Sequence, residues 1–141
     1  MDACLKAGVT PLAYYPLAMG LLTGRPAREG GGRREKDLRE SAVKVEPLAE
    51  VLREVGGRYG KTPAQVALNW VMCKGAVPIV GITRESHVDA NLGSLGWRLK
   101  KEDVEVLERC SDELDFVFKG AGFQSTEAKF VGYGWEKWTL D

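Results

Sequence analysis

Two stretches of the sequence hold residue types that could bind a flat ring and a phosphate. In the first, Tyr14 is followed by small residues, among them Ala18 and Gly20. An aromatic side chain can stack on a heterocycle, and small residues let backbone N–H groups approach a pyrophosphate. An ordinary core tyrosine at the end of a strand explains the same residues, and without further information this plainer interpretation is favoured.

The second stretch leads from an apolar run through Gly81 and Arg84 into a helix. Free N–H groups and the helix dipole attract anions to a helix N-terminus, and an arginine can hold a phosphate through two hydrogen bonds. One such junction is common and indicates little. Two of them in consecutive strand–helix units would meet at the same edge of a parallel sheet, which favours one shared binding site.

Two apolar runs are predicted to form the strands that position these loops. Residues 11–15 are bracketed by Pro11 and Pro16, and prolines end a strand abruptly. Residues 76–82 are apolar without alternation, which is typical of a strand covered on both faces in a parallel sheet.

The spacing of apolar residues predicts four helices, at 47–58, 62–74, 85–95 and 101–113. Pro47 suits the first position of the first helix, and Thr83 or Ser86 would cap the third. Thr62 and Gln65 form a capping box, in which each side chain accepts a hydrogen bond from the backbone of the other residue. The helix that this box begins is apolar nearly all round, so it is expected to lie between two layers.

The order of these elements predicts an α/β fold with parallel strands. Two strands are fewer than an ordinary sheet contains, so the pattern looks like part of a larger structure. Residues 24–44 are predicted to be a polar connection whose excess of positive charge would suit a phosphate, although a solvated loop explains it equally well. An aromatic-rich tail, 115–141, follows a main portion that comprises residues 1–114.

Composition narrows the class of protein. The chain has 141 residues, enough for one domain, and its twenty Lys and Arg residues balance twenty Asp and Glu residues. A net charge of zero argues against a nucleic-acid-binding protein, and no apolar run is long enough to span a membrane. Three widely spaced cysteines and one histidine predict no metal site and no disulfide framework, and they favour a reducing compartment.

Three stretches, in order and with similar spacing, resemble motifs of the aldo-keto reductase family. They are residues 13–24, residues 62–70, and residues 77–81 together with 91–97. The resemblance extends over residues 3–113. It implies the C-terminal part of a (β/α)8 TIM barrel, an incomplete barrel that holds strands seven and eight with their helices. It also implies binding of NADP(H) in an extended form, without a Rossmann domain.

The resemblance implies that residues in both loops bind the cofactor. Tyr14 would stack on the nicotinamide, and His87 and Asn91 would flank the adenine. The residues implied to line the pyrophosphate are Tyr15, Pro16, Leu17, Ala18, Gly20 and Arg25. The residues implied to hold the adenosine 2′-phosphate are Gly81, Ile82, Thr83 and Arg84. The segment 24–44 would fold over the cofactor, and the tail would rim the substrate pocket.

Three positions depart from the family's pattern. Tyr15 stands in place of a serine, His87 in place of an arginine or glutamine, and Ala90 in place of an acidic residue. The change at Ala90 removes a contact to the adenine. We therefore expect weaker cofactor binding than in a standard member, with the same ligand.

The catalytic residues of the family have no counterpart in this sequence. In the family a hydride passes from the nicotinamide to a carbonyl carbon, and a tyrosine, assisted by a lysine, an aspartate and a histidine, protonates the oxygen. All four belong to the first half of the barrel, so no catalytic residue is assigned here. Two tyrosine–lysine pairs, Tyr59 with Lys61 and Tyr133 with Lys137, do not follow a predicted strand.

Two functions therefore stay open. One is the NADPH-dependent reduction of aldehydes or ketones to alcohols, in which this chain supplies the cofactor-binding half. The alternative is a non-catalytic NADP-binding or partner-binding fragment similar to a potassium-channel β-subunit. The expected partners are a small carbonyl substrate and the missing N-terminal half of the barrel, in the cytoplasm or a plastid. Two strands alone leave both sheet edges open, so we expect poor independent folding.

Overall fold

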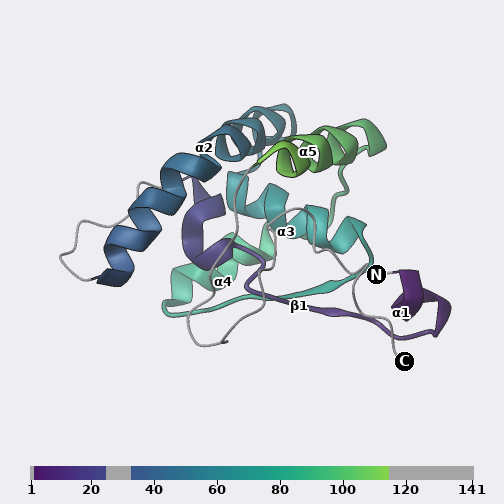
Figure 1. The fold of residues 1–141 in the computed structure, drawn as a ribbon. Coiled ribbons are helices and arrows are strands. Elements are labelled where there is room, and N and C mark those ends of the chain that lie inside the picture. The colour runs from purple at the N-terminus through teal and green to yellow at the C-terminus, as the bar shows by residue number, and fades with distance from the viewer. Residues whose placement is uncertain (1, 25–32, 115–141) are drawn as a thin grey trace, which may run out of the picture.

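The computed structural model describes residues 2–24 and 33–114 of the chain. Its elements are, in order, α1 (Asp2–Lys6), β1 (Leu12–Tyr14), the 3-10 helix η1 (Ala18–Thr23), α2 (Arg33–Tyr59), α3 (Pro63–Cys73), β2 (Val77–Ile79), α4 (Glu85–Leu92) and α5 (Lys101–Glu113) (Figure 1). The two predicted strands and four predicted helices are therefore confirmed, with changes in their bounds. The tail, 115–141, lies outside the described residues.

The strands β1 and β2 pair in parallel, as the sequence predicted. Leu12 lies opposite Val77, Ala13 opposite Pro78, and Tyr14 opposite Ile79. Each strand is only three residues long, shorter than the predicted 11–15 and 76–82. Proline limits the ladder, because Pro11 and Pro78 have no N–H group to donate.

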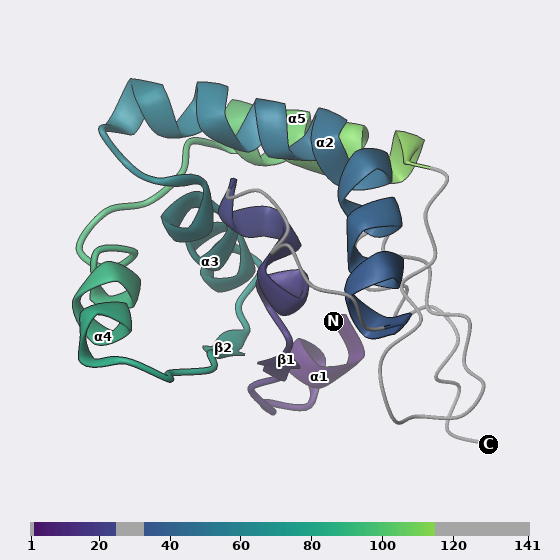
Figure 2. The same cartoon turned by 90° about the vertical axis from the view of Figure 1, so that its left-hand side faces the viewer.

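Helix α3 lies between the sheet and a layer formed by α2 and α5 (Figure 2). Its capping box is confirmed, since the Gln65 N–H donates to the Thr62 hydroxyl at 3.3 Å and the Thr62 N–H donates to the Gln65 side chain at 3.0 Å. Val71 packs with Ala13 on the sheet side, whereas Val66 faces the other layer. The expected position between two layers is therefore confirmed.

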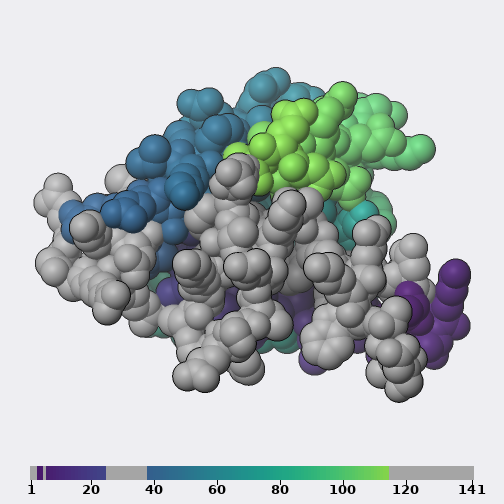
Figure 3. All heavy atoms as spheres, in the orientation of Figure 1, coloured from purple at the N-terminus to yellow at the C-terminus, as the bar shows by residue number. Residues whose placement is uncertain are grey.

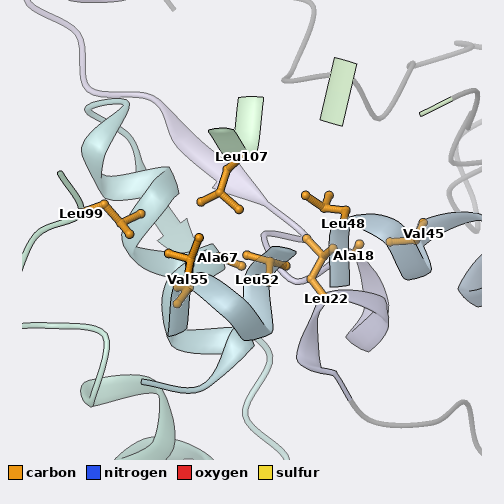
Figure 4. Close-up of a cluster of buried hydrophobic side chains, with 10 residues drawn as sticks. Ala18, Leu22, Val45, Leu48, Leu52, Val55, Ala67, Leu99 and Leu107 are labelled. Carbon is orange, nitrogen blue, oxygen red and sulfur yellow. The ribbon is translucent and has the colours of Figure 1, made fainter. Parts of the chain in front are cut away.

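The main core lies between η1, α2, α3 and α5 (Figure 4). Its buried members are Ala18, Leu22, Val45, Leu48, Leu52, Val55, Val66, Ala67, Leu99 and Leu107. Figure 3 shows α2 and α5 side by side at one face of the molecule, where they close this core from outside. The core thus stands apart from the sheet, and η1 is the element that links it to the end of β1.

The sequence prediction for residues 24–44 is wrong from Arg33 onward, because α2 begins there and continues to Tyr59. Arginine, lysine and glutamate have good helix propensity, so a charged stretch can extend a helix whose other end is packed. Pro47 lies inside α2 and not at its first position. The helix bends in Figure 2, as expected for an internal proline that lacks an N–H group and crowds the preceding turn.

The predicted cap of α4 is also wrong. Arg84 occupies the N-cap position in an extended conformation, and no side chain caps the helix there. The Thr83 hydroxyl lies 3.4 Å from Nδ1 of His87 instead. The helix ends at Leu92, and Gly93 follows in a helical conformation. Among the described residues, we find no helix with the length and hydrophobicity to cross a bilayer.

Candidate functional site

The loop that follows β1 and the loop that follows β2 begin at the same edge of the sheet. Tyr14 and Ile79 are the last residues of the two strands and are partners in the parallel register. The chain therefore leaves both strands at the same edge, toward η1 in one case and toward α4 in the other (Figure 2). This confirms the predicted meeting of the two junctions.

Tyr14 is exposed at this edge. Its exposed fraction is 58%, whereas that of Ala13 is 3%, so the interpretation of Tyr14 as a core tyrosine does not hold in this structure. Its ring centroid lies 4.0 Å from that of Tyr15, with the planes tilted by 46°. A hydrogen bond between the two side chains raises the pKa of the Tyr14 phenol above its ordinary 10.0. The neutral ring of Tyr14 thus presents an accessible face.

The loop after β1 is held in an unusual backbone conformation. Tyr15, Ala18 and Met19 have positive φ angles of 54°, 49° and 57°, which side-chain-bearing residues rarely adopt, and Gly20 follows at 96°. Buried Ala18, 1% exposed, fastens the loop to the core. Backbone strain of this kind persists only where the surrounding structure enforces it, and it concentrates at functional sites.

Two backbone N–H groups of this loop, which were expected to approach a pyrophosphate, already have hydrogen-bond partners. The Ala18 N–H donates to the Tyr15 carbonyl at 2.9 Å, and the Gly20 N–H donates to the Leu17 carbonyl at 2.9 Å. The expectation that these N–H groups are open to a pyrophosphate is therefore not met in this structure, because the loop turns back on itself. Pro16 is buried and Leu17 half-buried, while Arg25 lies outside the described residues.

The loop after β2 is open to solvent. Its residues Gly81, Ile82, Thr83 and Arg84 are all exposed. Since Arg84 is the N-cap of α4 and no side chain caps that end, a cationic residue stands beside the positive end of the helix dipole. Glu85 follows in the first turn and contributes the opposite charge. The arrangement can still attract a phosphate through Arg84 and the helix N–H groups.

His87 and Asn91 lie four residues apart on α4 and are both half-buried. Residues at this spacing share one face of a helix, so the two side chains can contact the same ligand. Ala90, the position where the family has an acidic residue, is exposed beside them. The structure thus places Tyr14 at the end of β1, and Arg84, His87 and Asn91 at the start and along one face of α4.

Tyr59 and Lys61 take part in contacts that hold helices together. The Tyr59 hydroxyl donates to Asp103 and accepts a hydrogen bond from the Lys100 N–H at 3.0 Å. The Lys61 ammonium group donates to the Gly93 carbonyl at 3.1 Å and lies 5.6 Å from the Trp97 ring centroid. The other pair, Tyr133 and Lys137, lies outside the described residues.

The sequence predictions did not include a group of polar side chains at the start of α3. Gln65 and Asn69 lie four residues apart on α3, and Lys61 lies just before its N-cap Thr62. Each of the three donates to a backbone carbonyl in the last turn of α4 or just after it. A polar residue at every fourth position of an otherwise apolar helix was the available signal. It indicates a stripe that contacts backbone groups.

Comparison with known proteins gives the class of this chain. The model of the aldo/keto reductase family matches residues 1–112, and the chain belongs to this family. It is 40% identical over 112 residues to the chloroplastic pyridoxal reductase of Arabidopsis thaliana, an alignment that covers 78% of this chain and 31% of that protein. It is 27% identical over 126 residues to the aldo-keto reductase yakc of Schizosaccharomyces pombe, whose name includes NADP(+), with 83% and 37% of the two chains covered.

Solved structures agree on the fold. The glycerol dehydrogenase of Gluconobacter oxydans superimposes with a TM-score of 0.70 at 20% identity, over 88% of this chain and 40% of the other. The fold is thus that of part of an aldo-keto reductase (β/α)8 barrel. The chain spans about a third of the length of the curated relatives it matches.

Proposed function

We propose that this chain is the cofactor-binding, C-terminal portion of an NADPH-dependent reductase of aldehydes or ketones. The observation that carries the proposal is the parallel register of Tyr14 with Ile79, which brings an exposed aromatic ring and the loop of Arg84 to one edge. A ring-binding group and a phosphate-binding group at one edge suit a dinucleotide. The name of the Schizosaccharomyces pombe relative favours NADP over NAD.

The exposed groups fit NADPH at its two ends. Tyr14 would hold the nicotinamide by stacking and so fix which face of the ring meets the substrate. Arg84 would pair with the adenosine 2′-phosphate, with His87 and Asn91 beside the adenine. The residues Tyr15, Pro16 and Leu17 would border the pyrophosphate, together with Arg25. When bound, the cofactor supplies a hydride to the carbonyl carbon.

The partner that completes the site is the rest of the barrel. Leu12, Tyr14, Val77 and Ile79 point away from α3 and are 46–64% exposed. In the described residues each strand is also paired at one edge only. We propose that β1 and β2 are strands seven and eight, that the preceding strands cover this apolar face, and that they supply the proton donor and the pocket for the carbonyl substrate. All three cysteines are free thiols, which suits the cytoplasm or a plastid.

The binding test measures NADPH, NADH and 2′,5′-ADP by calorimetry on the full chain. Arg84→Ala is expected to weaken NADPH and 2′,5′-ADP about tenfold or more, with a small effect on NADH, since one charge-assisted hydrogen bond is lost. Arg109→Ala, which removes an exposed arginine of α5, is the matched control. Equal losses for NADPH and NADH would contradict the assignment of Arg84.

The catalytic test joins this chain to the N-terminal portion of the Arabidopsis pyridoxal reductase that precedes the matched segment. The joined protein is expected to oxidise NADPH when an aldehyde is added, and Tyr14→Ala is expected to reduce that rate more than Tyr14→Phe. NADPH binding without any turnover in the joined protein would favour the non-catalytic alternative. Absence of binding would overturn both.

A further inference from the structure

We propose that Gln65 is a positioning residue that holds α4, and with it Arg84 and His87, at the distance from Tyr14 that cofactor binding requires. This inference rests on the proposed function. It assigns a role to a residue of α3 that lies outside the cofactor-binding loops and needs no contact with the ligand.

Helix α4 has no fully buried apolar side chain in the described structure. None of its eight residues is buried. Val88 and Leu92, its larger apolar residues, are 37% and 55% exposed. Polar contacts with the start of α3 are therefore an important part of its attachment to the rest of the fold.

Those contacts come from Gln65 and Asn69 on α3 and from Lys61 just before it. The Gln65 side-chain amide donates to the Ala90 carbonyl at 2.8 Å, and Lys61 donates to the Gly93 carbonyl at 3.1 Å. Asn69 donates to the Ser94 carbonyl at 3.0 Å. Of these acceptors, only Ala90 belongs to α4, and its carbonyl is one of those that the last turn of a helix leaves without a partner. The bonds of Lys61 and Asn69 hold the chain that follows the helix, so Gln65 is the residue that reaches α4 itself.

Both polar atoms of the Gln65 side-chain amide have partners. Its amide oxygen accepts from the Thr62 N–H at 3.0 Å in the capping box, while its nitrogen reaches Ala90. Gly93 makes room for that nitrogen, because a Cβ there would lie 2.2 Å from it. Gln65 thus joins the rigid start of α3 to the last turn of α4.

The experiment separates these two bonds in the full chain. In Gln65→Glu, a carboxylate oxygen still completes the capping box, but no N–H group remains for Ala90. Thr62→Ala is the matched control, since it removes the Thr62 hydroxyl from the box and leaves the Gln65 amide in place. Gly93→Ala is a second variant that displaces the amide from the other side. Measurements are hydrogen exchange of residues 85–95 without ligand, and affinities for 2′,5′-ADP and nicotinamide mononucleotide.

Gln65→Glu and Gly93→Ala are expected to speed exchange in α4 about tenfold and to weaken 2′,5′-ADP about fivefold. Affinity for nicotinamide mononucleotide should stay constant, because Tyr14 is held by β1. Thr62→Ala should change neither property. Unchanged exchange in α4, or faster exchange with unaltered 2′,5′-ADP affinity, would overturn this inference alone. Failure of the wild-type chain to bind either ligand would overturn it together with the proposed function.

Discussion

The Tyr59 hydroxyl donates a hydrogen bond to the carboxylate of Asp103 and so joins the last residue of α2 to the first turn of α5. Asp103 is 5% exposed and also accepts from the Arg58 guanidinium. The Lys100 N–H, just before α5, donates to the same Tyr59 hydroxyl. A single buried carboxylate therefore fixes how the two outer helices meet.

Asp103→Ala is expected to lower the free energy of unfolding by about 2–3 kcal/mol, because two hydrogen bonds to a charged group are lost and their donors remain. Glu54→Ala is the control. Glu54 is the other acidic partner of Arg58, with 3.2 Å between its carboxylate oxygen and the guanidinium nitrogen, but its side chain is exposed. Its cost should stay below about 0.5 kcal/mol. Urea unfolding followed by circular dichroism measures both, and equal costs would contradict the role given to Asp103.

The Tyr59 hydroxyl should also make stability depend on alkaline pH. Burial, followed by the hydrogen bond to Asp103, raises its pKa above the ordinary 10.0. The folded state therefore keeps its proton where the unfolded state has lost it, so the contribution of Tyr59 is complete below about pH 10 and declines as pH rises toward the folded pKa. Urea midpoints of the wild type and Tyr59→Phe should differ most below about pH 10, and the difference should shrink as the pH rises above that value. A constant difference would contradict the assignment.

Two adjacent glycines of α2 should respond in opposite directions to alanine. A Cβ at Gly56 would lie 2.3 Å from the backbone oxygen of Lys61, whereas a Cβ at Gly57 meets nothing within 4 Å. Gly56→Ala is expected to destabilise the fold by about 1–3 kcal/mol through this clash. Gly57→Ala should stabilise it by about 0.5–1 kcal/mol, since alanine favours the helix. Thermal unfolding of both variants tests the close approach of α2 to the turn before α3.

Asn69 should be the most sensitive polar position of α3. It is 2% exposed, donates to the Ser94 and Trp97 carbonyls, and accepts from the Leu99 N–H at 3.0 Å. Asn69→Leu leaves these three backbone groups without their partner and is expected to cost about 3 kcal/mol or more. Cys73→Ala removes a weak sulfur contact to Asn69, at 3.5 Å, and the packing of one half-buried sulfur against the core, and it should cost about 1 kcal/mol. Denaturant titration would show similar costs for both if the hydrogen bonds contributed nothing.

The sequence predicted those features of the fold that depend on residues close together in the chain. The capping box of Thr62 and Gln65 and the parallel pairing were predicted correctly, because both follow from residues close in sequence or from the alternation of strands and helices. The start of α2 at Arg33 was not predicted, because that charged stretch is helical only as an extension of a packed helix. The second bond of Gln65, to Ala90, depends on tertiary structure and has no local signature.

For the candidate site, the sequence correctly predicted that the two loops would meet. It could not predict that the Ala18 and Gly20 N–H groups are used within their own loop, because this depends on the positive φ angles of Ala18 and Met19. The residues alone favoured a buried Tyr14, whereas the family resemblance implied an accessible ring, and Tyr14 is exposed. The sequence around an aromatic residue at a strand end is the same whether that residue faces the core or the solvent, because this depends on the register of the strand.

The pairing of Ala13 with Pro78 has a consequence for the order of events during synthesis. At ribosomal speeds of about 5–20 residues per second, β2 emerges several seconds after β1. Helices α2 and α3 are complete in that interval and can pack before any sheet exists. The ladder between β1 and β2 therefore forms only after the two helices that separate them in the sequence have been made. During that interval, the side of β1 that later pairs with Val77 and Ile79 carries unpaired backbone N–H and C=O groups, which are the groups through which strands of different chains associate.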